Sequence, residues 1–309
     1  MKLTLEQVKL FLDEHAKQPV SDIVTLSGGQ WSQAFGFGEA GKDYVIRFGQ
    51  HEEDYLKDQL ASKFMSDKLP IPKVLHVGKS FDGYFAISER AFGTMLDDLD
   101  KPAMKRVIPS LFRTLDGIRE THISNGGGYG AWDTKGSGKY QSWREFLLDV
   151  VNDRPDSRTH GWKAGLKNSP IGDGPFNEAY SLLTKLSSGL PEVRSLIHND
   201  LVNFNVIVNE DRITAVFDWA NALYGDFLYD LAMFTLWGAI HKPIMGVDWE
   251  AEAIAHYKAI GLEVPQFKRR LQCCMVHLGL DAQAYYGYKQ DWEWLEPMAK
   301  RTLEIANSI

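Results

Sequence analysis

The stretch LIHNDLVNFNVIVNEDRITAVFDWANALYGD, Leu196–Asp226, carries the residues with the most distinctive spacing in the sequence. Its apolar segments NVIV and ITAVFDW flank the polar sequence NEDR, a pattern that predicts a β-hairpin with its turn at Glu210–Asp211. Pairing about that centre sets residue 205 opposite residue 216. Residue 218 then lies about 7 Å further along the neighbouring strand at ~3.3 Å per residue, so Asn205 and Asp218 can reach one ion.

These side chains supply hard oxygen ligands. An Asn carbonyl and an Asp carboxylate suit Mg²⁺, which takes few protein ligands and completes its octahedron with water and phosphate oxygens. Asp200 precedes Asn205 by five residues, near enough to accept a proton from a hydroxyl attacking a phosphate. With His198, these residues reproduce the kinase spacing H-x-D-x-x-x-x-N followed by a metal-binding Asp. Asn and Asp residues near strand ends are singly also turn formers. Together with His198, these residues favour phosphoryl transfer.

Composition excludes several other classes of protein. With 309 residues, 44% apolar and 24% charged, the chain can bury the cores of two lobes. No apolar run is long enough to cross a bilayer, and MKLTLEQVKLFLDEH reads as an amphipathic helix, not a signal peptide, so we expect a cytoplasmic protein without membrane contact. The net charge of −7 argues against a nucleic-acid partner. Adjacent Cys273 and Cys274 cannot build a disulfide framework or a tetrahedral metal site.

The N-terminal third predicts an antiparallel sheet with one inserted helix. Thr4 and Gln7 form a capping box ahead of a helix that ends near His15. Five β-rich runs follow: DIVTL, AFGFG, DYVIRFG, KVLHVG and YFAISE. A helical pattern from about Glu52 to Ser66 separates the third run from the fourth.

From Pro102 onward helical periodicity dominates, so the sequence predicts an α+β fold with a small first lobe and a larger, mainly helical second lobe. The change at SERAFGTML sets the lobes at residues 1–91 and 92–309. The Gly-rich segment Gly126–Tyr140 is interpreted as a plain loop and not a phosphate cradle, because no strand precedes it and no helix opens within it. Asp226 is interpreted as a structural N-cap.

The resemblance to a known family extends well beyond the catalytic spacing. The segments LPIPKVLHVG, YQSWREFL, PEVRSLIHNDLVNFNVIVNEDRITAVFDW and RRLQCCMVHLGLD resemble the aminoglycoside phosphotransferases, in particular the members that act on hygromycin B. The resemblance implies a two-lobed protein-kinase-like fold with ATP held between the lobes. It also implies Asp200 as catalytic base, Asn205 and Asp218 as magnesium ligands, and His198 as a brace of the catalytic loop.

By the same resemblance, Glu89 and Ala91 fall at the interlobe hinge that offers backbone groups to adenine. Gly28, Gly29 and Ser32 occupy the loop that covers the phosphates. That loop, SGGQWSQAFGFG, lacks the protein-kinase pattern G-x-G-x-x-G.

Arg47 is the one departure from the kinase pattern, because it stands where kinases place a Lys on the third strand. Asp58 matches the helix Glu that pairs with that Lys. An Arg–Asp pair can replace Lys–Glu, since the guanidinium fork is longer and the carboxylate stem is shorter.

The expected substrate is a small molecule, because fewer than ten residues separate Asp218 from Gly225–Asp226 and leave no room for a kinase activation segment. We expect a monomer that uses ATP and Mg²⁺ to phosphorylate a cationic aminoglycoside. Two alternatives stay open: a kinase for a metabolite such as choline, homoserine or a sugar, and a pseudokinase, which only Arg47 suggests. Acidic residues that could grip the substrate, such as Asp149, Asp153 and Asp156, are too numerous to choose among.

Overall fold

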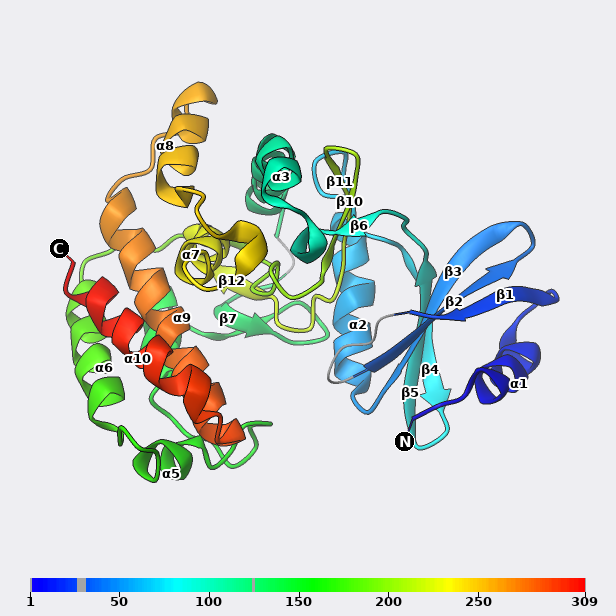
Figure 1. Ribbon diagram of the computed structural model, residues 1–309, viewed down its shortest axis with the longest axis horizontal. Coiled ribbons are helices and arrows are strands. Elements are labelled where there is room, and N and C mark those ends of the chain that lie inside the picture. Colours follow the sequence, from blue (N-terminus) through cyan, green and yellow to red (C-terminus); the bar gives the residue numbers. More distant parts are fainter. Residues whose placement is uncertain (1, 27–31, 124–125, 309) are drawn as a thin grey trace. The chain divides into compact units, whose positions relative to one another are not determined.

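The computed structural model describes residues 2–26, 32–123 and 126–308, which form two compact units (Figure 1). The first unit comprises Met1–Gly117, Asp133–Gly136 and Asn203–Asn221, and the second comprises Ile118–Trp132, Ser137–Val202 and Ala222–Ile309. The lobe boundary at residues 91 and 92 stays a prediction. No helix in the described ranges is long and apolar enough to cross a membrane.

A five-stranded antiparallel sheet forms the centre of the first unit and confirms the predicted one. Its strands, in the order β1-β2-β3-β5-β4, are β1 (Val20–Thr25), β2 (Ser32–Glu39), β3 (Lys42–Gly49), β4 (Val74–Ser80) and β5 (Gly83–Glu89). The predicted N-terminal helix is α1 (Leu5–His15), and its capping box between Thr4 and Gln7 is present. Local alternation and capping therefore predict this region well.

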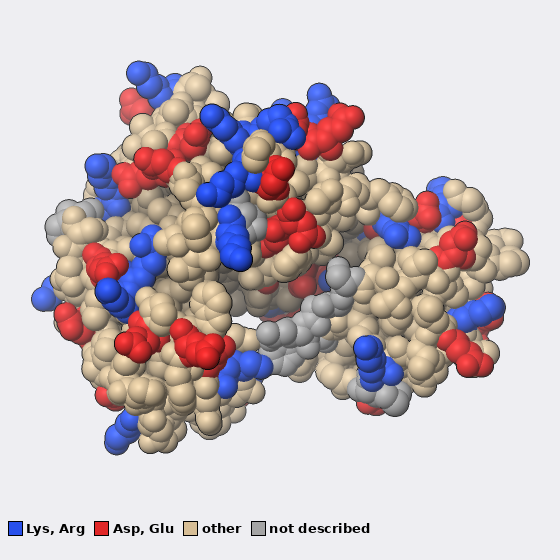
Figure 2. All heavy atoms as spheres, in the orientation of Figure 1, with Lys and Arg blue, Asp and Glu red and all other residues tan. Residues whose placement is uncertain are grey.

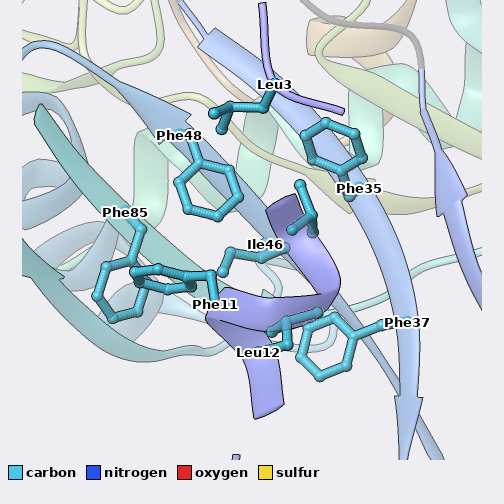
Figure 3. Close-up of a cluster of buried hydrophobic side chains, with 9 residues drawn as sticks. Leu3, Phe11, Leu12, Phe35, Phe37, Ile46, Phe48 and Phe85 are labelled. Carbon is cyan, nitrogen blue, oxygen red and sulfur yellow. The ribbon is translucent and has the colours of Figure 1, made fainter. Parts of the chain in front are cut away.

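One face of the sheet is covered by α1. Buried side chains from the helix, from the segment just before it and from β2, β3 and β5 form a single apolar cluster: Leu3, Val8, Phe11, Leu12, Phe35, Phe37, Ile46, Phe48 and Phe85 (Figure 3). The Phe11 ring meets Phe48 and Phe85 edge-on, with centroid distances of 5.2 and 4.9 Å. This edge-to-face arrangement is the favourable one for aromatic pairs.

The opposite face is covered by α2 (Glu52–Ala61), which continues as the 3₁₀ helix η1 (Ser62–Phe64). Tyr55 of α2 packs there with Val74 and Ala86. Because successive side chains of a strand point to opposite faces, Arg47 points towards α2 while its neighbours Ile46 and Phe48 enter the α1 cluster. The alternation of β3 thus directs its one arginine at the helix that follows it.

A second sheet of the first unit contains the predicted hairpin. Its strands, in the order β11-β10-β6, are β6 (Thr94–Met95), β10 (Val206–Asn209) and β11 (Arg212–Val216). The 3₁₀ helix η2 (Leu96–Asp98) follows β6.

The predicted register of this hairpin is correct beside the turn and wrong beyond it. A β-bulge shifts the pairing, so Val206 and not residue 205 lies opposite Val216. Asn205 lies opposite Phe217 instead, and its backbone carbonyl accepts the N–H of Phe217 at 3.1 Å. Asp218 is therefore one residue, not two, beyond the partner of Asn205, which shortens the separation expected from an unbroken ladder.

The second unit is mainly helical, as predicted. Its helices are α4 (Trp143–Asp149), α5 (Trp162–Lys167), α6 (Gly174–Leu186), α7 (Leu228–Trp237), η3 (Lys242–Ile244), α8 (Trp249–Ala259), α9 (Phe267–Lys289) and α10 (Trp292–Ala306), and α3 (Lys101–Glu120) runs into it from the first unit. The largely buried α9 packs against α5, α6, α7 and α10, and it contains both buried cysteines.

The interpretation of Gly126–Tyr140 as a plain loop is wrong, because the segment contributes two strands to a sheet of the second unit. In the order β8-β7-β12-β9, the strands are β7 (Tyr129–Trp132), β8 (Gly138–Tyr140), β9 (Ser195–Ile197) and β12 (Leu223–Gly225). Strands of three or four residues are too short to show an alternation, and their pairing depends on segments far along the chain. β9 leads directly into His198.

Asp226 is structural, although its expected N-cap position is wrong by one residue. Phe227 holds the N-cap position of α7, while the Asp226 carboxylate accepts the N–H of Leu228 at 3.1 Å. The same carboxylate accepts two bonds from the Arg270 guanidinium, at 2.7 and 2.8 Å, and both side chains are buried. This bidentate pair joins the start of α7 to α9.

We expect Arg270→Ala to destabilise the protein by about 3–5 kcal/mol, because it leaves the buried Asp226 charge unpaired. Arg106→Ala is the matched control: Arg106 pairs with Asp211 at 2.9 Å, but both are exposed, so its loss changes the free energy of unfolding by about 0–1 kcal/mol. Urea unfolding of both variants measures the difference. Equal effects would show that burial adds nothing to the Asp226–Arg270 pair.

Candidate active site

The carboxylate of Asp58 joins three parts of the first unit. One oxygen accepts a bond from the Arg47 guanidinium of β3, and the other accepts the backbone N–H of Trp219 at 2.6 Å. Both Arg47 and Asp58 are largely buried, with side-chain exposures of 14% and 5%. The predicted Arg47–Asp58 pair is therefore present, and it extends to the residue that follows Asp218.

The surroundings of Arg47 favour the charged form of its guanidinium. Burial alone lowers the pKa of a guanidinium, but the negative charges of Asp58 and Asp218 outweigh that effect and raise the pKa of Arg47 above its usual value. Arg47 is thus a permanent cation next to a predicted metal ligand. A buried cation of this kind suits an anionic ligand such as a phosphate chain.

Lys57, the residue before Asp58 on α2, also contacts the segment after Asp218. Its buried ammonium donates to the carbonyl of Ala220 at 3.1 Å. Two consecutive residues of α2 therefore hold the backbone that follows Asp218. Asp218 itself has a left-handed backbone, φ 63°, a conformation that Asp tolerates better than most residues.

Asn205 and Asp218 both lie in the first unit. On the hairpin, Asp218 is one residue beyond Phe217, whose backbone pairs with Asn205. Asn205 is buried and Asp218 is half-buried. No group of three or more His, Cys, Asp or Glu suited to a metal occurs in the part of the chain that the structure describes. One amide oxygen and one carboxylate nevertheless fit Mg²⁺, because this ion keeps most of its positions for water and phosphate oxygens.

The predicted hinge follows β5. The N–H of Glu89 donates to the carbonyl of Lys73 at 3.0 Å, and the next N–H, of Arg90, donates to the carbonyl of Asp43 at 3.1 Å. Ala91 comes next and is half-buried. The backbone leading into Ala91 is thus fixed by Asp43 of β3 and by Lys73, the residue before β4.

Ser32, a predicted phosphate-loop residue, begins β2 and pairs with Gly49 of β3. Gly28 and Gly29 lie outside the described residues.

Asp200 belongs to the second unit and is held by its own loop. Its backbone N–H donates to Nδ1 of His198 at 3.2 Å, which requires the His198 tautomer protonated on Nε2. His198 is fully buried. Five residues of chain separate Asp200 from Asn205, so the two Cα atoms are at most about 18 Å apart.

Comparison with known proteins identifies the family. Residues 22–264 match the model of the phosphotransferase enzyme family. Hygromycin-B 4-O-kinase from Escherichia coli is 32% identical over 238 residues, which are 76% of this chain and 68% of that protein. The chain belongs to the phosphotransferase enzyme family. The family expected from the sequence is confirmed, and with it the expectation of an enzyme.

Solved structures of phosphotransferases agree. Aminoglycoside phosphotransferase APH(4)-Ia matches with a TM-score of 0.85 and 28% identity over 99% of each chain. A ternary complex of a thermostable mutant of that enzyme with AMP-PNP and hygromycin B matches with a TM-score of 0.84 and 29% identity over 98% of each chain. Spectinomycin phosphotransferase, at 16% identity and a TM-score of 0.60, shares the fold. The predicted kinase-like α+β fold is confirmed.

Asp230 of α7 is a residue of this phosphotransferase that the sequence analysis missed. Its two oxygens accept the backbone N–H groups of His198 and Asn199, at 2.9 and 2.8 Å. Burial raises the pKa of Asp230 to about 6; the two N–H groups act against this, and the charge of Asp200 adds to it. A lone carboxylate among the buried apolar residues of α7 was the signal in the sequence.

Two acidic residues considered for gripping a cationic substrate have structural partners. Asp149 accepts bonds from Tyr140 at 2.6 Å and from Arg154 at 2.6 and 3.1 Å. Asp153 accepts the N–H groups of Gly161 and Lys163 at the start of α5. Elsewhere, acidic and basic side chains intermingle over the face shown in Figure 2.

We expect Asp58→Ala to weaken binding of Mg·ATP by about tenfold or more, because it removes the carboxylate that pairs with the buried Arg47 and accepts the Trp219 N–H, which leaves Asp218 as the nearby negative charge. Asp58→Asn keeps an acceptor and loses only the charge, so its effect is intermediate. Calorimetric titration with and without Mg²⁺ measures both, with Asp13→Ala on α1 as control. Wild-type affinity and magnesium dependence in Asp58→Ala would show that the pair does not organise the site.

Asp230 predicts a pH dependence of stability. Because its folded-state pKa is raised from 3.8 to about 6, the folded protein binds this proton more readily than the unfolded chain between those values. The contribution of Asp230 to the free energy of unfolding therefore falls as pH rises through the window. Asp230→Asn abolishes that fall.

Relative to wild type, Asp230→Asn should gain about 1 kcal/mol of stability between pH 5 and pH 7. The same variant loses kcat at pH 7, because an amide oxygen serves only one of the two loop N–H groups well. Thermal melts at pH 5, 6 and 7 measure the first effect. A stability difference that is constant across this range would mean that Asp230 titrates normally.

Proposed function

We propose that this phosphotransferase transfers the γ-phosphoryl group of ATP to a hydroxyl of hygromycin B and thereby inactivates the antibiotic. The observation that carries the proposal is the end-to-end match to APH(4)-Ia at 28% identity, which covers 99% of both chains. A match of that length covers the residues that would bind the antibiotic as well as the catalytic motif from His198 to Asp218. The relative named for O4 phosphorylation makes O4 the proposed position on the antibiotic.

In this proposal the first unit binds the nucleotide. Arg47, oriented by Asp58, contacts the α- and β-phosphates, as expected of a buried fork-shaped cation. Backbone groups of Glu89 and Ala91 meet the adenine. Gly28, Gly29 and Ser32 belong to the loop over the phosphates.

Asn205 and Asp218 would hold the magnesium ion. When bound, the ion supplies charge neutralisation to the phosphate oxygens. The Lys57 and Asp58 contacts fix the backbone after Asp218, so the carboxylate is positioned before any ligand arrives.

Asp200 is the proposed catalytic base. It accepts the proton of the substrate hydroxyl as that oxygen attacks the γ-phosphorus in line with the leaving oxygen of ADP. The His198 ring and the Asp230 carboxylate orient the loop without touching the reacting atoms. They are positioning residues.

We also propose a charge preference for the substrate, an oligomeric state and a location for this protein. The net charge of −7 favours a polycationic substrate over nucleic acid. We propose a monomer that acts in the cytoplasm, without a membrane partner. A metabolite kinase and a pseudokinase remain the alternatives, and the assay below distinguishes all three.

We expect hygromycin B to be phosphorylated with a kcat/KM about 30-fold or more above that of kanamycin or gentamicin, because a mismatched ring scaffold leaves polar groups of the pocket unpaired. Coupled ADP release across these drugs, choline, homoserine and sugars measures the preference.

Asp200→Ala should lower kcat by about 10²- to 10⁴-fold with ATP affinity retained, because it removes the proposed base. Asp211→Ala, an exposed control, should leave kcat unchanged.

Three outcomes contradict the proposal in different ways. A metabolite turned over faster than every drug makes the protein a metabolite kinase. No turnover of any acceptor by the wild type supports the pseudokinase. Near-normal turnover by folded Asp200→Ala removes Asp200 from the mechanism and leaves the substrate assignment intact.

A further inference from the structure

The catalytic loop offers few side chains to a substrate. Between Asp200 and Asn205, Leu201 and Val202 are buried, and only Asn203 and Phe204 are exposed. Phe204 is only four residues from Asp200 in the sequence, so their Cα atoms are at most about 14 Å apart. An exposed aromatic ring therefore stands directly before a proposed magnesium ligand.

Phe204 is held in a strained conformation. Its backbone is left-handed, φ 59°, a region that bulky residues rarely adopt, and its side chain is 51% exposed. Its N–H donates to the buried carboxylate of Asp97 at 2.9 Å. The backbone is thus fixed from the protein side while the ring is directed to solvent, and backbone strain of this kind gathers at ligand-binding sites.

Phe81 provides an internal comparison in the same unit. It is also left-handed, φ 45°, and also 51% exposed. Its ring, however, packs against Phe11 and Phe48 at centroid distances of 5.4 and 5.7 Å, so contacts inside the protein account for its position. Among the described residues no aromatic ring and no cation contacts the ring of Phe204. Ring packing among the described residues therefore does not explain its strain.

We propose that Phe204 is an acceptor-binding residue whose ring takes the ammonium-bearing face of a sugar or aminocyclitol ring of the substrate. The face of an aromatic ring attracts cations, and it also covers the apolar C–H face of a saturated ring. The residues proposed above to bind the nucleotide do not include Phe204, so this contact selects the acceptor and not ATP. The inference rests on the proposed function, since it needs a cationic glycoside as acceptor.

The test is a set of substitutions that separates the ring from the backbone. Phe204→Gly removes the ring and adopts a positive φ without strain, so the bond from the backbone N–H of residue 204 to Asp97 and the loop geometry are retained. Phe204→Tyr keeps an aromatic face, and Phe204→Leu keeps apolar bulk without one. Phe81→Gly is the matched control for loss of an exposed, left-handed Phe.

The KM for hygromycin B should rise about tenfold in Phe204→Gly and less in Phe204→Leu, and it should stay within about twofold in Phe204→Tyr and Phe81→Gly. The KM for ATP should change by less than about twofold in all four, since the ring does not contact the nucleotide. Phe204→Gly with an unchanged KM for hygromycin B, or with both KM values raised together, would overturn the proposal. Wild-type turnover of hygromycin B, measured first, tests the proposed function separately.

Discussion

The carboxylate of Asp58 is shared between a side chain and a backbone amide that are far apart in the sequence. Arg47 approaches it from the sheet and the N–H of Trp219 from the segment after Asp218, while Asp58 itself belongs to α2. The orientation of Arg47, the proposed phosphate-binding cation, and the position of Asp218, a proposed metal ligand, thus depend on one side chain. Loss of that carboxylate removes the hydrogen-bonded counter-ion of a buried guanidinium and the acceptor of the Trp219 N–H in one step.

This arrangement explains how the departure from the kinase Lys–Glu pair is accommodated. The Asp stem is one methylene shorter than that of Glu, and the Arg side chain is correspondingly longer than Lys. The bond to Asp58 uses Nη2 of Arg47, so the other guanidinium nitrogens do not serve that carboxylate. Because the surrounding charges keep Arg47 protonated, the substitution retains a cation where the phosphates are expected. The pair itself gives no support to the pseudokinase.

The sequence predicts the elements whose signals are local. Alternation in β1 to β5, the Thr4 capping box and the polar turn before β11 each depend on neighbours along the chain, and each prediction is confirmed. The spacing from His198 to Asp218 indicates a kinase-like site for the same reason. What the sequence does not predict depends on contacts between distant segments, namely the bulge in the hairpin, the short strands β7 and β8, and the anchoring of His198 by Asp230. Phe204 belongs with these, since nothing in NFNV predicts its left-handed backbone.

Asn205 and Asp218, positioned through Asp58, are the proposed protein ligands of the catalytic metal. Crystals grown with AMP-PNP and Mn²⁺ in place of Mg²⁺ test this assignment directly, because manganese is located by its anomalous scattering. We expect an anomalous peak within coordination distance of the Asn205 side-chain carbonyl oxygen and of an Asp218 carboxylate oxygen, beside the phosphates of the nucleotide. A nucleotide-bound manganese ion that is coordinated by neither residue would contradict it.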